Sequence, residues 1–344
     1  MHNCQEISEG LVYLGGNDRR ISLFESAYPV PRGVSYNSYL LKDEKTALID
    51  TVDIAVGDLF FENLAYALGG APLDYVIVQH MEPDHSATFA RLIELYPDVT
   101  VVTSQKAAVM LKNYFGYAGQ AHLVKEGDTL SIGKRTLTFV GAPMVHWPEV
   151  LFTYVPEDGI LFSADAFGTF GAVSGSIIAD KDVFERDYLD DARRYYFNIV
   201  GKYGVQVQAV LKKAAGLKIS TVCPLHGPVW KDGFAWYLDK YLTWSAYQPE
   251  EKCVAIFYAS VYGHTQNAAE IVASAIAAHG VRVKVFDVSV TDKSELVSAA
   301  FGCSHLVFAS TTYNNGIFVN MEDFLSDLKA HNFQNRAYAI VENG

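Results

Sequence analysis

The stretch that decides the fold is His80-Met81-Glu82-Pro83-Asp84-His85, which places four side chains of metal-binding type on one short loop. It follows the apolar run Tyr75 to Val78, which predicts a buried strand, so the loop emerges where a rigid sheet edge ends. Loops at strand ends commonly carry catalytic residues. In an extended backbone, residues 80, 82 and 84 project to one face and residue 85 elsewhere, so one loop can serve two adjacent ions.

Three further candidates each lie at the end of an apolar run that predicts a strand: His146, Asp165 and His226. Seven ligands suit two metals, and Asp165, with two carboxylate oxygens, is the candidate bridge between them. Nitrogen and oxygen ligands without a thiolate suit iron as well as zinc, so ligand softness leaves the metal open. In the alternative without a metal, His80 and His85 cap or hydrogen-bond and the acids are solvated.

The composition predicts a globular protein long enough for two domains, with 344 residues of which half are hydrophobic. A formal net charge of −12 without a Lys/Arg cluster argues against a nucleic-acid partner. Without a signal pattern or an apolar run of about 18 residues, we expect a soluble, cytoplasmic protein with no membrane contact. The four cysteines form no CxxC pair and suggest neither a zinc site nor a disulfide framework: Cys4, Cys223, Cys253 and Cys303.

Two kinds of organisation follow one another along the chain. Up to about residue 238, short β-like runs with interspersed helices predict a layered α/β domain of two sheets covered by helices. After the polar stretch Ala246 to Lys252, strands and helices alternate regularly, which predicts βαβ units and a parallel sheet. We therefore expect domains at residues 1–249 and 250–344. The helices expected in the first domain are Asp58 to Leu68, Ser86 to Tyr96 and Gln105 to Tyr114.

Two loops of the second domain have the composition of a ligand site. One opens a helix after the strand Val254 to Tyr258, where hydroxyls, N–H groups and the helix dipole favour a phosphate. An ordinary N-cap by Thr265 is the alternative. The residues of this first loop are Ser260, Val261, Tyr262, Gly263, His264 and Thr265. The second loop follows the third strand and offers hydroxyls, an aromatic face and amides, which could surround the ring of a ligand and the chain attached to that ring. The residues of this second loop are Thr311, Thr312, Tyr313, Asn314 and Gly316.

The order HxExDH, followed by a later His, Asp and His, resembles the metallo-β-lactamase fold in the variant used by flavodiiron proteins. In that variant Glu82 stands where hydrolases usually carry a histidine, and this replacement favours iron over zinc. The stretch Gly33 to Leu40 is similar to the family's early strand, and Asp165-Ala166-Phe167-Gly168 is similar to its bridging-aspartate turn. The two loops of the second domain resemble the first two FMN loops of flavodoxin.

This resemblance covers nearly the whole chain and implies an α/β protein. Its fold would be a metallo-β-lactamase-like αββα sandwich followed by a flavodoxin-like, doubly wound parallel sheet. The implied cofactors are a diiron centre and FMN. By position, one iron would be held by His80, Glu82 and His146, the other by Asp84, His85 and His226, with Asp165 bridging both. A flavodoxin-like sheet has five strands, and only four precede Gly344, so we expect the sheet to be C-terminally incomplete and the third flavin loop to be missing.

The implied activity is reduction of O2 to water or of NO to N2O, with electrons from a small donor such as rubredoxin. In the family the flavin of one subunit faces the iron site of another, which implies a head-to-tail homodimer or a tetramer. Tyr195 and Tyr196 are candidates for a hydroxyl that assists bound oxygen, against the alternative of core packing. Glu25 and Tyr28 are candidates to line the same pocket.

Three other functions stay open. They are a zinc-dependent hydrolase of the same fold, a diiron oxygen sensor without turnover, and a flavin electron carrier with a relic metal domain.

Overall fold

The computed structural model describes all of residues 1–344, and the chain forms two compact units. The first unit comprises residues 1–192 and 209–237, and the second comprises residues 193–208 and 238–344. The domain boundary at residue 250 stays a prediction, because residues on both sides of it belong to the second unit.

The first unit contains two sheets. The larger has seven strands in the order β1-β2-β7-β8-β9-β10-β11. Their bounds are Gln5–Ser8 (β1), Leu11–Tyr13 (β2), Tyr39–Lys42 (β7), Thr46–Ile49 (β8), Tyr75–Val78 (β9), Thr100–Thr103 (β10) and His122–Leu123 (β11). The smaller has five strands in chain order: Thr129–Ser131 (β12), Thr136–Gly141 (β13), Leu151–Val155 (β14), Ile160–Phe162 (β15) and Thr221–Cys223 (β16). Two short ladders pair Gly16–Asp18 (β3) with Val34–Tyr36 (β6) and Leu23–Phe24 (β4) with Tyr28–Pro29 (β5).

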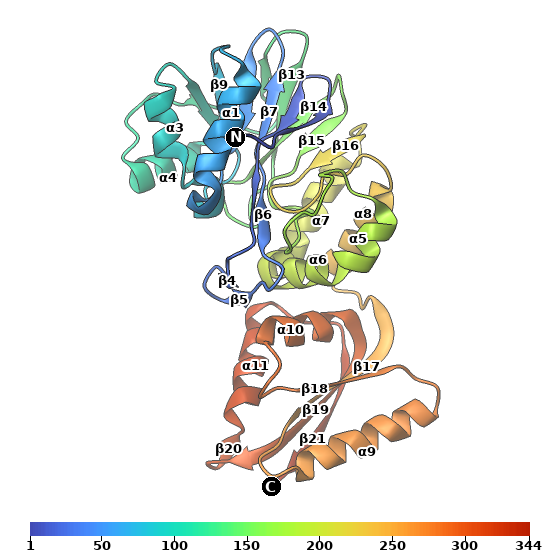
Figure 1. Ribbon diagram of the computed structural model, residues 1–344. Coiled ribbons are helices and arrows are strands. Elements are labelled where there is room, and N and C mark those ends of the chain that lie inside the picture. The colour runs from blue at the N-terminus through green and yellow to red at the C-terminus, as the bar shows by residue number, and fades with distance from the viewer. The chain divides into compact units, whose positions relative to one another are not determined.

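The core of this unit lies between the two sheets. Tyr39 of β7 and Phe162 of β15 meet there with ring centroids 5.5 Å apart. They belong to one buried cluster with Ile77 of β9 and Phe139 of β13. Helices cover the outer faces, and Figure 1 shows α1, α3 and α4 beside the strands of the larger sheet. The two packed sheets with helices outside confirm the predicted sandwich, and burial of this apolar surface is its main source of stability.

The helices begin and end at residues with recognisable signals. The side chain of Ser104 accepts a hydrogen bond from the Ala107 N–H and so caps α4, which ends at Gly116 in the left-handed conformation (φ +64°). The bounds are Gly57–Leu68 (α1), Pro83–Ser86 (α2), Phe89–Leu95 (α3), Gln105–Phe115 (α4), Lys181–Asp187 (α5), Leu189–Tyr195 (α6), Gly204–Ala214 (α7) and Phe234–Ser245 (α8). The expected helix from Ser86 is wrong in its start, because residues 83–86 form a separate turn and α3 begins at Phe89.

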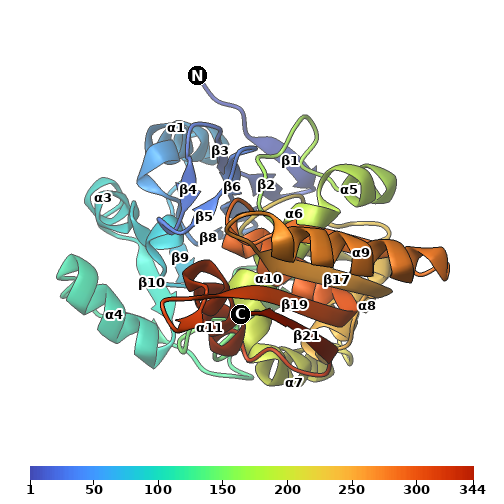
Figure 2. The ribbon, with the colours of Figure 1, turned by 90° about the horizontal axis from the view of Figure 1, so that it is seen from below.

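The second unit is built on a parallel sheet in the order β18-β17-β19-β21. Its strands are Glu251–Ala259 (β17), Val283–Asp287 (β18), Cys303–Tyr313 (β19) and Ala337–Asn343 (β21), and its helices are His264–Ala278 (α9), Lys293–Gly302 (α10) and Val319–Ala330 (α11). Ile256 of β17 packs with Ala269 and Ala273 of α9, whereas the adjacent Phe257 packs against Phe324 of α11. Helices therefore cover both faces, as Figures 1 and 2 show, and this confirms the predicted doubly wound arrangement.

The second candidate flavin loop is a β-hairpin and not an open loop. Strand β19 continues to Tyr313 and pairs antiparallel with Gly316–Ile317 (β20). The two residues between them, Asn314 and Asn315, have φ of +51° and +59°. Two left-handed residues give the turn whose twist matches a two-residue hairpin, and asparagine tolerates this conformation well.

A disulfide joins Cys253 of β17 to Cys303 of β19, with Cα atoms 5.1 Å apart. The cysteine spacing did not suggest this bond, because the two residues are 50 positions apart and become neighbours only when two parallel strands pair. Cys4 and Cys223 are free. No helix combines the length and the apolar character that crossing a bilayer requires.

The second unit also contains a buried carboxylate with three donors. Arg193 Nε lies 2.6 Å and Lys240 Nζ 2.8 Å from the carboxylate oxygens of Glu250, and the indole N–H of Trp244 donates to it at 3.1 Å. Burial alone would raise the pKa of Glu250, but the hydrogen bonds and charges of Arg193 and Lys240 lower that pKa to about 2.

Glu250→Gln is expected to destabilise the second unit at pH 7 and to lose this effect in acid. An unfolded glutamate has a pKa of about 4.3, so a folded value of about 2 contributes on the order of 3 kcal/mol above pH 4.3. Because the folded pKa is lowered, this contribution falls as the pH drops from about 4.3 towards 2. Urea unfolding of the full chain, followed by tryptophan fluorescence at several pH values, measures it.

The matched control is Glu251→Gln. Glu251 pairs with Arg282, whose side chain is 66% exposed, so we expect a loss of less than about 1 kcal/mol. A Glu250→Gln defect that does not change between pH 7 and pH 2.5 would contradict the assignment.

Candidate metal centre and flavin-binding loops

The motif His80 to His85 begins just after β9 and runs into the single helical turn α2. Glu82 is the N-cap of this turn and Pro83 its first residue, where proline fits because its φ is fixed and its missing N–H is not needed. Asp84 and His85 therefore project from a helical turn, and the expected extended backbone is wrong from residue 83 onward. The turn still directs the four side chains of the motif into two neighbouring groups.

The first group contains His80, Glu82, His146 and Asp165. Glu82 Oε2 lies 3.2 Å from His80 Nε2 and 3.1 Å from His146 Nε2. Asp165 Oδ2 lies 3.2 Å and 3.1 Å from the same two nitrogens. With metal–ligand bonds of about 2.0–2.2 Å, neighbouring ligand atoms around one ion are about 3–3.5 Å apart. The spacing of the four atoms fits a single cation.

The second group contains Asp84, His85 and His226. Their ligand atoms have the same spacing, which again fits ligands around one ion. Asp84 Oδ2 is 3.3 Å from His85 Nε2 and 3.2 Å from His226 Nε2, and the two nitrogens are 3.1 Å apart. Asp165 also reaches this group through its other oxygen, with Oδ1 3.1 Å from His85 Nε2 and 3.7 Å from His226 Nε2. One oxygen of Asp165 thus faces each group.

The residues present fit a pair of cations. Both oxygens of Asp84 and Oδ1 of Asp165 are buried and have no hydrogen-bond partner in the protein. Buried anionic oxygens without a partner are costly, and a bound cation removes that cost. The ligand atoms are imidazole nitrogens and carboxylate oxygens only, a set that suits iron.

Two buried acids near these groups escaped the sequence analysis. Asp50, directly after β8, accepts hydrogen bonds from the Gln79 and His80 N–H groups and so holds the backbone before the motif. Burial raises the pKa of Asp50 to about 6, although hydrogen bonds from Gln79 oppose the rise. Glu149 lies 2.8 Å from His80 Nδ1. Asp50 could have been found from the sequence, because it is a polar residue at the end of a predicted strand. No sequence pattern marks Glu149.

Glu25 lies near the first group, on the hairpin formed by β4 and β5. Glu25 is exposed, but nearby protein atoms displace part of the water around its carboxyl group. This desolvation, together with the charge of Glu82 and a hydrogen bond to it, raises the pKa of Glu25 to about 8. Glu25 itself has φ +49°, a left-handed conformation that is uncommon for glutamate. The N-terminal segment therefore reaches the metal ligands, as the candidate role of Glu25 requires. Tyr28 packs its ring against Phe170, 6.1 Å away between centroids.

The two tyrosines singled out in the sequence, Tyr195 and Tyr196, belong to the second unit and are fully buried there. The ring of Tyr196 packs against those of Tyr241 and Trp244, with centroids 4.8 Å and 5.3 Å away. This environment is that of a core residue. The catalytic role of the pair stays a prediction.

The first flavin loop presents an open helix N-terminus. The N-cap of α9 is Gly263, at φ +88°, and no side chain caps the helix there. A Cβ on Gly263 would meet no atom within 4 Å, so the space in front of it is open. The expected alternative, a cap by Thr265, is not present, and Thr265 Oγ1 instead accepts a hydrogen bond from Asn343. Free N–H groups at the positive end of a helix suit a phosphate.

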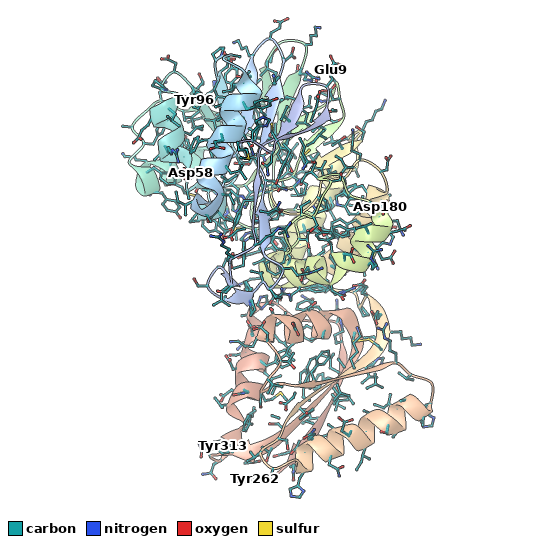
Figure 3. All side chains as sticks on the ribbon, in the orientation of Figure 1. Glu9, Asp58, Tyr96, Asp180, Tyr262 and Tyr313 are labelled. Atoms are coloured by element: carbon teal, nitrogen blue, oxygen red, sulfur yellow. A yellow bond between two sulfur atoms is a disulfide. The ribbon has the colours of Figure 1, made fainter.

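Aromatic side chains from both flavin loops lie close to this helix end. Figure 3 shows Tyr262 of the first loop and Tyr313 of the hairpin at the same end of the second unit. Tyr262 is 89% and Tyr313 48% exposed, so both rings are accessible to a ligand. A phosphate site with exposed aromatic rings nearby fits FMN.

Two family models match the chain: ODP family beta lactamase over residues 34–227 and flavodoxin over residues 256–341. The chain is 33% identical over 326 residues to the nitric oxide reductase of Moorella thermoacetica, covering 94% of this chain and 81% of that protein. The crystal structure of the flavodiiron protein from Giardia intestinalis superposes with a TM-score of 0.93 and 28% identity, covering 99% of this chain and 84% of that one. The chain belongs to the flavodiiron protein family.

Two further proteins are similar to the chain. The anaerobic nitric oxide reductase flavorubredoxin of Aliivibrio fischeri is 32% identical over 95% of this chain and 67% of its own length. Rubredoxin oxygen:oxidoreductase from Desulfovibrio gigas superposes with a TM-score of 0.92 at 28% identity, over 99% of this chain and 85% of that one. Family membership confirms the expected cofactors, a diiron centre and FMN, and an oxidoreductase activity.

Proposed function

We propose that this protein reduces a diatomic gas, O2 to water or NO to N2O, at an iron pair in its first unit. The observation that carries the proposal is Asp165, whose two oxygens face two separate ligand groups. Such an arrangement holds two cations side by side, as in two-metal sites generally. Names of relatives support both gases, since they include nitric oxide reductases and a rubredoxin oxygen:oxidoreductase.

We assign one iron to His80, Glu82 and His146 and the other to Asp84, His85 and His226, with Asp165 shared. When bound, the iron pair supplies a reducing site for the gas and FMN supplies it with electrons. The chain's own residues position these groups. Asp50 fixes the backbone that carries His80, and the Ser35 carbonyl accepts a hydrogen bond from His226 Nδ1 at 2.7 Å, which turns Nε2 towards the metal.

In the second unit we assign the FMN phosphate to the N-terminus of α9. Backbone N–H groups after Gly263 and the hydroxyls of Ser260 and Thr265 surround that point. The hairpin residues Thr311 to Gly316 and the first-loop residue Tyr262 are assigned to the flavin ring and its ribityl chain. Hydroxyl and amide groups would bind the polar edge, and the tyrosine rings would cover a face.

We propose further that electrons come from a small donor protein such as rubredoxin. The flavin of one subunit would serve the iron site of another in a head-to-tail homodimer or a tetramer. A cytoplasmic location is consistent with such a donor.

The test is gas consumption by the full chain. The protein is loaded with ferrous iron and FMN, reduced without oxygen by a rubredoxin and its reductase, and supplied in parallel with O2 or NO at matched concentrations. We expect donor-dependent consumption of at least one gas, and the ratio of the two rates identifies the preferred one. Zinc retention with ester hydrolysis, or oxygen binding without consumption of donor electrons, would overturn the proposal in favour of a hydrolase or a sensor.

A further inference from the structure

A buried carboxylate stands directly behind one of the candidate ligands. The side chain of Glu149 is fully buried, and its Oε1 lies 2.8 Å from His80 Nδ1. The same oxygen accepts a hydrogen bond from the Met81 N–H at 3.0 Å. Glu149 thus binds both the ring of His80 and the backbone of the next residue.

The surroundings hold this contact in place. The hydroxyl of Ser104 donates to the Glu149 carbonyl at 3.0 Å, and the Leu151 N–H donates to the Gln79 carbonyl at 3.1 Å. The segment carrying Glu149 is therefore tied to the backbone just before the motif. The ring of Trp147 packs edge-on against the ring of His80, with centroids 5.3 Å apart. The imidazole has little freedom to rotate.

This geometry determines which nitrogen of His80 carries the proton. Nε2 lies 3.2 Å from both Glu82 Oε2 and Asp165 Oδ2, so it faces the metal ligands. A metal-bound imidazole uses a lone pair on one nitrogen and leaves the N–H on the other. With a metal on Nε2, the N–H is on Nδ1 and donates to Glu149, whose negative charge makes the opposite nitrogen a stronger electron donor.

The Nδ1 atoms of the two imidazoles in the second metal group have different surroundings. His226 Nδ1 faces a neutral backbone carbonyl, that of Ser35, at 2.7 Å. His85 Nδ1 is buried without a hydrogen-bond partner in the protein. Glu149 itself has one oxygen, Oε2, without a partner, so its buried charge is balanced through His80 and whatever cation His80 binds.

We propose that Glu149 is a positioning residue that makes the two metal sites unequal. By orienting the imidazole of His80 and accepting a hydrogen bond from its Nδ1, Glu149 strengthens the site of His80, Glu82 and His146 relative to that of Asp84, His85 and His226. The first site then binds its ferrous iron more tightly and fills first. This inference rests on the proposed assignment of His80 as a metal ligand.

The test compares Glu149→Gln with the unaltered full chain. Glutamine keeps the shape and an acceptor oxygen for His80 but removes the charge. Titration of the metal-free protein with ferrous iron, against a chromophoric chelator and without oxygen, gives the two affinities separately. We expect one iron to bind about 10- to 100-fold more weakly, the usual cost of losing a carboxylate behind a ligand. The other affinity should change less than about threefold.

The control, Glu94→Gln, alters an exposed acid on α3 and should change neither affinity.

A second measurement needs no variant. In the diamagnetic zinc-loaded protein with labelled histidine, nitrogen–proton NMR should show His80 with its proton on Nδ1, shifted strongly downfield by the carboxylate. Unchanged affinities in Glu149→Gln, equal weakening of both irons, or a proton on Nε2 of His80 would each overturn the inference. Failure of the unaltered chain to bind two metals would instead overturn the proposed function, so the two failures are distinguishable.

Discussion

Asp165→Ala is expected to leave at most one iron per chain and to lower gas consumption at least about 10²-fold. The physical reason is that Asp165 presents one oxygen to each ligand group, Oδ2 at 3.1 Å from His146 Nε2 and Oδ1 at 3.1 Å from His85 Nε2. Losing a residue that only supports a metal ligand already costs 10- to 100-fold in affinity or activity, so losing a shared ligand should cost more. Metal analysis after gel filtration and the parallel O2 and NO assays measure the two effects.

The control for this variant is Asp182→Ala, which removes a 92% exposed aspartate from α5 and should keep both irons and full activity. Asp165→Asn separates charge from shape, because the amide retains one oxygen ligand. It should keep more iron than Asp165→Ala. An Asp165→Ala protein that holds two irons and turns over normally would show that the bridging assignment is wrong.

Loss of the Cys253–Cys303 bond is expected to cost the second unit about 4 kcal/mol of unfolding free energy. The bond closes a loop of about 50 residues, and in the chain-entropy model a loop of that size restricts the unfolded chain by about this amount. Both sulfur-bearing residues are at most 1% exposed, so a reductant reaches them only when the strands open. Urea unfolding of a Cys253→Ser/Cys303→Ser double variant measures the cost.

Reductant provides the internal check on this prediction. It should lower the unfolding midpoint of the unaltered chain and leave that of the double variant unchanged. Cys4→Ser, which removes a free and partly exposed thiol, should behave like the unaltered chain. Titration of the unreduced, unfolded protein should find two free thiols, and finding four would contradict the disulfide.

The clustering of the candidate metal ligands was predictable because of how strands end. His80, Asp165 and His226 each follow an apolar run, and apolar runs form the buried strands β9, β15 and β16, whose ends lie beside one another. The expected extended path through the motif failed at Pro83. Proline favours the first position of a helical turn, and this preference outweighs the alternation of side chains in an extended strand.

Other features depended on contacts that chain order does not contain. Glu149 meets His80 across 69 positions because the segment before β14 of the smaller sheet lies against the end of β9 of the larger sheet. Cys253 meets Cys303 across 50 positions because β17 and β19 pair side by side. No local pattern marks such partners. The hairpin at Asn314 and Asn315 is different, because two consecutive asparagines followed by Gly316 favour a tight turn and the signal was present.

The origin of the ligands in both sheets has a consequence for assembly. His80 follows a strand of the larger sheet, whereas Asp165 and His226 follow strands of the smaller one. Neither sheet alone carries the whole candidate set, so a bound cation pair would link the two sheets and stabilise their packing. A substitution in the apolar core between the sheets, far from any candidate ligand, would consequently lower the iron content of the protein.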